Sequence, residues 1–142
     1  MIGRVLGLDL GEKTLGIAIS DVLGMIANGV ETYTFPPYEI EKALERVKYF
    51  VNKENIKEIA LGLPLHMSGE ESDHSRLCRS FKEMIENDLK GVKVILIDER
   101  WTTKQAQRVL IKEADFSRQK RKKIIDKMAA QIILETYLMG RN

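Results

Sequence analysis

The chain has 142 residues, of which 44% are hydrophobic and 31% are charged, and its formal net charge is +2. This length and composition predict one globular domain, residues 1–142, that can bury a core without covalent staples. The single cysteine, Cys78, excludes an internal disulfide framework and a thiolate metal site. No run approaches the ~18 apolar residues of a membrane span, and no signal-peptide pattern opens the chain. We therefore expect a cytoplasmic protein with no membrane partner.

Three strand-like segments open the chain. Residues 4–10 form a nearly continuous apolar run, which is typical of a strand buried on both faces. Alternation of residue types predicts a second strand at 15–20 and a third at 26–35, paired as an antiparallel meander. One side of the second strand carries small residues that would let a helix approach closely. These residues are Gly16, Ala18 and Ser20.

The remainder of the chain alternates helix-like and strand-like segments. Three antiparallel strands followed by such an alternation predict an α/β fold, with a mixed sheet and helices on both faces. The predicted elements are a helix at 39–52, a strand at 56–63, a helix capped by Ser72 or Asp73, a strand at 92–97, a helix from Thr102 to about Lys112 and a last helix at 119–138.

Three carboxylates occupy positions where an acid is either disfavoured or strongly placed. Asp9 lies within a buried strand, where an unpaired charge costs several kcal/mol. Glu99, beside Asp98, follows a strand at the edge where ligand sites of α/β sheets form. Asp126 shares a helix face with small and apolar residues that would pack on the sheet. If the three converge, bound Mg²⁺ or Mn²⁺ would offset their repulsion, and such a site suits phosphodiester hydrolysis.

Each of these side chains also has a purely structural explanation, which the sequence leaves open. A carboxylate can be neutralised by a nearby cation, and a histidine or tryptophan can simply lie at the surface or pack. The alternative partners are an internal lysine or arginine for Asp9, Arg100 for Glu99, and Lys122 or Lys123 for Asp126. His66 and His74 fit surface positions better than proton carriers, and Trp101 fits packing better than base stacking.

A basic segment opens the last predicted helix, with six cations and one anion in residues 118–127. Such a segment is often only a solvated helix end. The helix macrodipole, however, disfavours cations at this end, so their placement favours phosphate binding over that explanation. The predicted nucleic-acid-binding residues are Lys120, Arg121, Lys122 and Lys123.

Four motifs occur in order along the chain: LDLGEKTLGIA at 8–18, LGLPL at 61–65, DERWTT at 98–103 and IDKMAAQIIL at 125–134. Together they resemble the YqgF/RuvX family of bacterial proteins, within the ribonuclease H-like superfamily, over about residues 3–137. Trp101 stands where this family more often has leucine or phenylalanine.

The resemblance implies a ribonuclease H-like fold, a five-stranded mixed sheet in the order 3-2-1-4-5 flanked by helices. It also implies that Asp9, Glu99 and Asp126 form a catalytic, metal-binding cluster. The family is described as candidate nucleases that mature the 5′ end of 16S rRNA. An earlier proposal made its members Holliday junction resolvases, by similarity to RuvC.

The function that we expect is therefore a nuclease, dependent on Mg²⁺ or Mn²⁺, that acts on structured nucleic acid. Precursor 16S rRNA is the first candidate substrate, branched DNA is the second, and ribosomal particles are candidate partners. Two other classes stay open: a non-catalytic nucleic-acid-binding adaptor, and an ATPase-like phosphate module suggested by the first hairpin. The ATPase-like fold needs two lobes, and 142 residues supply one. Asp98 is a weaker candidate metal ligand than the three carboxylates of the implied cluster. The sequence does not distinguish a monomer from a homodimer, and it does not settle the roles of Asp98, His66 or Trp101.

Overall fold

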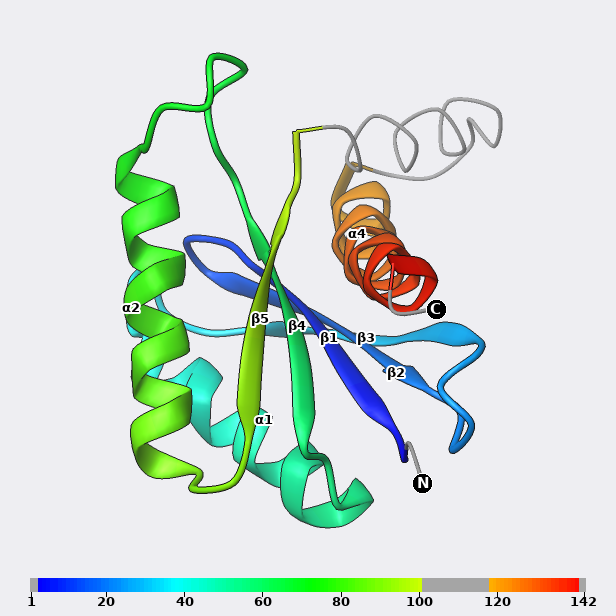
Figure 1. The fold of residues 1–142 in the computed structure, drawn as a ribbon. Coiled ribbons are helices and arrows are strands. Elements are labelled where there is room, and N and C mark those ends of the chain that lie inside the picture. The colour runs from blue at the N-terminus through cyan, green and yellow to red at the C-terminus, as the bar shows by residue number, and fades with distance from the viewer. Residues whose placement is uncertain (1–2, 101–117, 141–142) are drawn as a thin grey trace.

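One mixed sheet forms the centre of the molecule (Figure 1). The computed structural model describes residues 3–100 and 118–140, apart from the side chains of 118–125. The strands follow the order β3-β2-β1-β4-β5, with β1, β2 and β3 antiparallel and β4 and β5 added in parallel. The predicted five-stranded sheet and its order are thus confirmed. The strands are β1 (Val5–Leu10), β2 (Thr14–Ser20), β3 (Ala27–Thr34), β4 (Glu58–Leu63) and β5 (Lys93–Asp98).

Helices cover both faces of this sheet. Helices α1 (Ile40–Glu54) and α2 (Asp73–Asp88) lie on one side, and α4 (Arg118–Gly140) lies on the other (Figure 1). Ser72 caps α2 as predicted, since its hydroxyl accepts a hydrogen bond from the Ser75 amide at 3.0 Å. The predicted helix at 102–112 lies outside the described residues. None of the described helices has the length and apolar character that crossing a bilayer requires.

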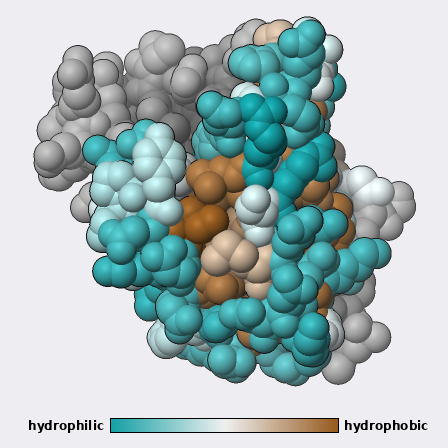
Figure 2. All heavy atoms as spheres, turned by 90° about the vertical axis from the view of Figure 1, so that its left-hand side faces the viewer, coloured by the Kyte–Doolittle hydropathy of each residue, from teal (hydrophilic) through white to brown (hydrophobic). Residues whose placement is uncertain are grey.

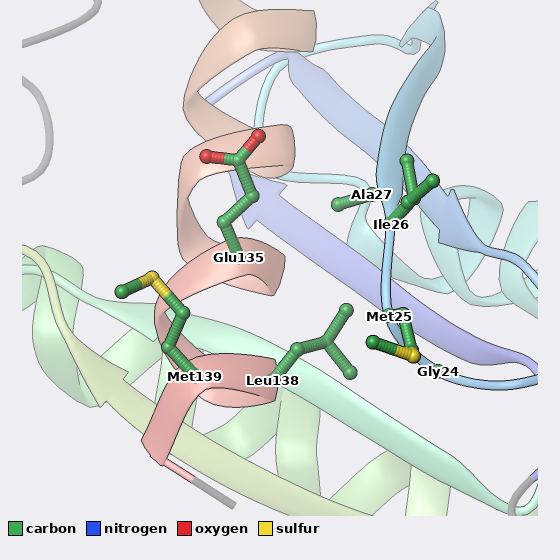
Figure 3. A pocket seen from close by; sticks show the side chains of 7 residues that line it. All are labelled: Gly24, Met25, Ile26, Ala27, Glu135, Leu138 and Met139. Atoms are coloured by element: carbon green, nitrogen blue, oxygen red, sulfur yellow. The ribbon is translucent and has the colours of Figure 1, made fainter. Parts of the chain in front are cut away.

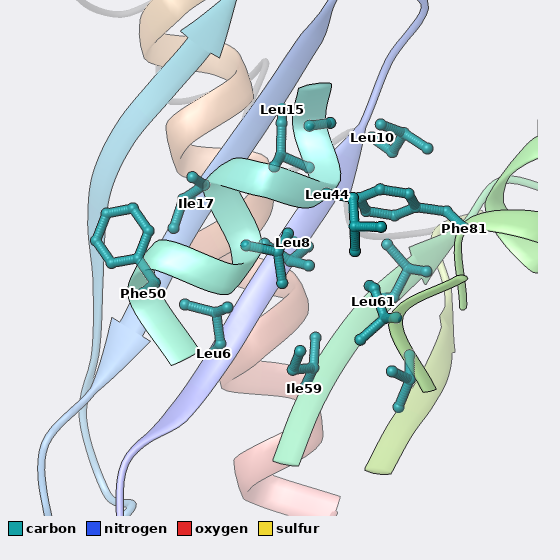
Figure 4. Packing of buried hydrophobic residues seen from close by; sticks show 14 of the residues in the cluster. Leu6, Leu8, Leu10, Leu15, Ile17, Leu44, Phe50, Ile59, Leu61 and Phe81 are labelled. Carbon is teal, nitrogen blue, oxygen red and sulfur yellow. The ribbon is translucent and has the colours of Figure 1, made fainter. Parts of the chain in front are cut away.

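Large aliphatic and aromatic side chains fill the space between the sheet and helices α1 and α2 (Figure 4). The side chains of β1 alternate between the two faces, as its sequence predicts. Leu6, Leu8 and Leu10 join this large core, whereas Val5 joins the smaller core beneath α4.

Small residues let α4 lie very close to the opposite face of the sheet. A methyl group at Gly7 would lie 2.7 Å from the Leu134 Cβ, and one at Gly16 would overlap the Asp126 carbonyl oxygen. Ala18 and Ala130 are fully buried in the same contact. The predicted close approach of a helix to the small side of β2 is confirmed, and it sets the position of Asp126.

Candidate active site

A hollow of about 340 Å³ opens at the carboxyl ends of β1 and β5, beside α4. The structure brings the three carboxylates singled out in the sequence, Asp9, Glu99 and Asp126, to this one hollow. Glu99 follows Asp9 by 90 residues in the sequence and precedes Asp126 by 27. The three nonetheless lie together at the edge of the sheet where ligand sites of open α/β sheets form. The remaining lining residues are Pro64, Leu65, Met67, His74, Arg100 and Ala129.

The pairing of β1 with β2 positions Asp9 against Asp126. Asp9 lies directly opposite Gly16 in the antiparallel ladder, and opposed residues share one face of a sheet. Because Gly16 has no side chain, the backbone of α4 can approach that face at Asp126. The absence of a side chain on β2 therefore brings the second carboxylate next to the first.

A second glycine makes the same kind of room for Glu99. The parallel register of Leu8 with Leu61 brings Gly62 of β4 level with Asp9. A methyl group at Gly62 would lie 2.6 Å from the carboxyl carbon of Glu99, so this position must stay bare for Glu99 to reach the hollow. The Glu99 amide donates to the Leu63 carbonyl at 3.1 Å, which fixes the backbone just after β5.

Burial and mutual repulsion dominate the electrostatics of this hollow. Glu99 and Asp126 are only 9% and 7% exposed, and Asp9 is half-buried. Burial first, and then the charge of Asp9, raise the pKa of Glu99 to about 10. The Glu99 and Asp9 side chains share a hydrogen bond, which requires a proton on one carboxyl. While that proton is bound, the Asp9–Glu99 pair carries one negative charge instead of two.

The geometry of the carboxylates is loose for a metal centre. In the part of the chain that the structure describes, no three His, Cys, Asp or Glu side chains already surround a common metal position. The hydrogen-bonded pair and Asp126 nonetheless line the same hollow. In the described residues, Asp9, Glu99 and Asp126 thus share a hollow without forming a preassembled set of metal ligands.

Asp98 has a different role from its neighbour Glu99. Its Oδ1 accepts from the Arg100 amide at 3.0 Å, and its Oδ2 accepts from Arg100 Nε at 2.8 Å. These bonds hold the pKa of Asp98 below its ordinary value. Arg100 Nη1 also donates to the Met67 carbonyl at 3.3 Å, which ties the loop after β4 to the rim of the hollow. Arg100 therefore pairs with Asp98, and the sequence analysis did not identify it as part of the site.

His74 is a second residue at the site that sequence reasoning did not assign there. Its Nε2 lies 2.6 Å from the Leu10 carbonyl, one residue beyond Asp9. A carbonyl only accepts, so this ring nitrogen must carry a hydrogen. His74 is solvent-exposed as predicted, yet it lines the hollow, whereas His66 is exposed on the loop and is absent from the described lining. The Ser72 cap, which fixes the start of α2, was the one sequence signal that pointed to its position.

The basic segment is described only by its backbone. Residues 120–123 lie in the first turns of α4, the helix that carries Asp126. Their side chains, and the whole of Trp101, lie outside the described residues. The assignment of Lys120, Arg121, Lys122 and Lys123 to nucleic acid stays a prediction.

Another hollow, of about 280 Å³, lies between the β2–β3 turn and the end of α4 (Figure 3). Met25 and Met139 flank it, and Glu135 is the one ionisable side chain in its described lining. A single carboxylate among apolar groups offers no acid–base pair or metal site. We therefore place the chemistry at the hollow that holds Asp9.

The comparisons with known proteins agree with this geometry. The family described as "RuvX: Holliday junction resolvase" matches residues 3–140. The chain belongs to the RuvX family. Among RuvX relatives, a protein of Bacillus subtilis strain 168 is 45% identical over 139 residues, covering 98% of this chain and 99% of its own. One of Geobacillus sp. strain WCH70 is 44% identical over 135 residues, covering 95% and 96%. Both are described as candidate pre-16S rRNA nucleases.

Solved structures support the ribonuclease H-like fold expected of a RuvX protein. Thermus thermophilus RuvC in complex with a Holliday junction substrate is similar, with a TM-score of 0.62 at 18% identity, covering 98% of this chain and 95% of that one. The Fowlpox virus resolvase, in complex with Holliday junction DNA, gives 0.59 at 16% identity, covering 97% and 98%. At these identities the likeness shows the fold alone.

Proposed function

We propose that this RuvX protein is a nuclease that hydrolyses phosphodiester bonds in structured nucleic acid, with precursor 16S rRNA as its first substrate. The observation that carries the proposal is the convergence of Asp9, Glu99 and Asp126 on one hollow. The choice of substrate is supported by relatives that are described as candidate pre-16S rRNA nucleases and are 44–45% identical over nearly the whole chain.

The donor set fits a hard divalent cation, Mg²⁺ or Mn²⁺. All three side chains offer carboxylate oxygens, the ligands such ions prefer. The proton shared by Asp9 and Glu99 offsets part of a repulsion that a divalent cation could offset more fully. When bound there, such a cation would stabilise charge on the phosphate and lower the pKa of an attacking water. The chain itself contributes the orientation of the three carboxylates.

The nucleic acid would approach along the start of α4. We assign phosphate binding to Lys120, Arg121, Lys122 and Lys123, because their backbone opens the helix that carries Asp126. A phosphodiester held at this end would lie one to two helical turns from Asp126. Arg100, at the rim of the hollow, is mostly neutralised by Asp98 and serves to fix the loop.

The test is cleavage of a 5′-extended 16S rRNA fragment in the presence of Mg²⁺ or Mn²⁺. We expect Asp9→Asn and Asp126→Asn to lower the cleavage rate by about 100-fold or more, because each removes a proposed ligand. Glu135→Gln is the matched control, since it neutralises an exposed carboxylate on the same helix, away from the hollow. Cleavage by Asp9→Asn at the wild-type rate would overturn the assignment.

The second candidate is cleavage of a four-way DNA junction, which the description of the family favours. A junction and the rRNA fragment can be compared in one experiment at equal salt and metal concentration. Faster cleavage of the junction would make branched DNA the substrate. Salt-dependent binding of both without cleavage by the wild-type protein would instead identify a non-catalytic adaptor.

A further inference from the structure

A larger hollow, of about 620 Å³, adjoins the candidate active site. His74 lines both, so the two hollows share one side chain. This second hollow lies between the β1–β2 turn and the first two turns of α2, and it contains none of the three proposed metal ligands. Its described lining is Gly11, Glu12, Tyr38, Asp73, His74 and Leu77.

Tyr38 presents its side chain at this hollow from an unusual backbone conformation. Its φ of 64° lies in the left-handed region, which is unfavourable for a residue with a bulky side chain. Two hydrogen bonds hold it there: its amide donates to the Glu12 carbonyl at 2.8 Å, and its carbonyl accepts from the Ile40 amide at 2.9 Å. Despite this constraint, 64% of the residue is exposed. The fold therefore keeps an aromatic ring at the surface where glycine would be less strained.

The lining suits a nucleobase better than a phosphate. Glu12 and Asp73 would repel a phosphate, but carboxylates accept hydrogen bonds from ring and exocyclic N–H groups of bases. Asp73 is partly neutralised, since its Oδ1 accepts from Arg76 at 2.6 Å, which leaves Glu12 as the stronger acceptor. Tyr38 and Leu77 add apolar surface, and apolar side chains also gather on the face of the molecule that carries α2 (Figure 2).

We propose that this hollow binds one nucleobase of the substrate, stacked on Tyr38, with its amino group donating to Glu12. Base stacking on an aromatic ring tolerates any base, whereas the carboxylate favours bases that carry an exocyclic amino group over uracil, whose only ring N–H lies between two carbonyl oxygens that repel a carboxylate. The base would lie in this hollow while its backbone enters the adjoining carboxylate hollow, which shares His74 with it. The inference rests on the proposed nuclease function for its substrate, but base binding itself does not require cleavage.

The first test uses the four free nucleosides, which carry no phosphate, and follows backbone amide NMR shifts of the full chain. We expect guanosine, adenosine and cytidine to shift the amides of Gly11, Glu12 and Leu77, and uridine to shift them least. The same titration on Glu12→Gln should abolish the difference between cytidine and uridine. Absence of shifts at these amides with every nucleoside would overturn the proposal.

The second test measures binding of a fluorescein-labelled 5′-extended rRNA fragment and a labelled four-way junction by anisotropy in EDTA. We expect Tyr38→Leu to weaken binding of one or both by about fivefold or more, and Tyr38→Phe to restore it, because stacking needs the ring. Tyr49→Leu is the matched control, since Tyr49 is an exposed tyrosine of α1 that lines neither hollow.

Tyr38→Gly separates binding from a structural role. Glycine relieves the positive φ, so this variant should unfold at a temperature equal to or above that of the wild type while it binds as weakly as Tyr38→Leu. Wild-type affinity in Tyr38→Leu and Tyr38→Gly would contradict base binding and leave the nuclease proposal standing. If the wild type does not cleave either substrate but its amides still shift with nucleosides, the nuclease proposal would be overturned and base binding would stand.

Discussion

The two faces of the sheet are built from different residues. The face beneath α1 and α2 is filled by large side chains, among them Phe81 and the leucines of β1, which are at most 1% exposed. The face beneath α4 carries mainly glycines and alanines, with all three proposed ligands at its edge. The large side chains of the first face remove more apolar area from water. The small residues of the second face bury less of it, but they let the backbone of α4 come close to the sheet.

This difference separates stability from chemistry. Burial of a carboxylate lowers the free energy of unfolding. Three carboxylates at one hollow therefore require a core elsewhere that stabilises the fold enough to offset them. The α1/α2 face provides that core, and the α4 face uses bare positions at Gly16 and Gly62 to bring the acids together. Substitutions on the first face should therefore change unfolding, and those on the second should change cleavage.

The largest effect on stability should come from Phe81→Ala. Phe81 is fully buried between α2 and the sheet, so truncation should lower the free energy of unfolding by about 3–5 kcal/mol. Urea denaturation measures the loss. At a temperature where the variant stays folded, we expect cleavage close to the wild-type rate. A loss of cleavage by folded Phe81→Ala would break the separation between the two faces.

Gly16→Ala should affect both properties. The added methyl group would overlap a backbone oxygen of α4, which cannot move aside as a side chain can. We expect a loss of about 1–3 kcal/mol in the free energy of unfolding and a displaced Asp126, with cleavage reduced accordingly. Gly140→Ala is the control, because nothing lies within 4 Å of a methyl group there. Wild-type stability and cleavage in Gly16→Ala would show that the close approach is not required.

Gly62→Ala should sharpen the comparison, because it alters the site without removing any of the three carboxylates. The methyl group would meet the Glu99 carboxyl and the Ile133 Cδ1, both at 2.6 Å, and these are ends of flexible side chains. We expect a stability loss of about 1 kcal/mol and a much larger proportional loss of cleavage. Thermal unfolding and cleavage kinetics should be measured on the same preparation. A lower unfolding temperature with an unchanged cleavage rate would contradict the prediction.

Glu99→Gln should change the way in which the free energy of unfolding depends on pH. The pKa of Glu99 rises from 4.5 to about 10 in the fold, so its protonated form favours folding below pH 4.5, and this contribution is lost as the pH rises towards 10. In EDTA the wild type should therefore lose stability with rising pH in this window more steeply than Glu99→Gln, as urea titrations from pH 5 to 9 would show.

Glu71→Gln is a control with the opposite sign. Arg79 lowers the pKa of Glu71 to about 2, so that contribution is present above pH 4.5 and is lost only as the pH falls towards 2. Glu71→Gln and the wild type should thus show parallel slopes from pH 5 to 9. Parallel slopes for Glu99→Gln as well would contradict the raised pKa of Glu99.

Residue patterns along the chain were sufficient to predict some of this arrangement. Period-two alternation predicted which side chains of β1 reach each face, and helical spacing placed Asp126 against the sheet. The residue types of Gly62 and His74 carry no comparable signal. The role of Gly62 depends on the pairing of β4 with β1, and that of His74 on the contact of α2 with the end of β1. These contacts form only in the folded chain. The positive φ of Tyr38 is likewise imposed by its hydrogen bonds to other segments.

Titration of Mn²⁺ into the metal-free protein by calorimetry tests the central claim most directly, because it depends on neither the substrate nor the rate of cleavage. We predict that the wild type and Glu135→Gln bind Mn²⁺ and that Asp9→Asn, Asp126→Asn and Gly62→Ala bind it at least about tenfold more weakly. Equal Mn²⁺ affinity in all five proteins, or no binding by the wild type, would contradict the account.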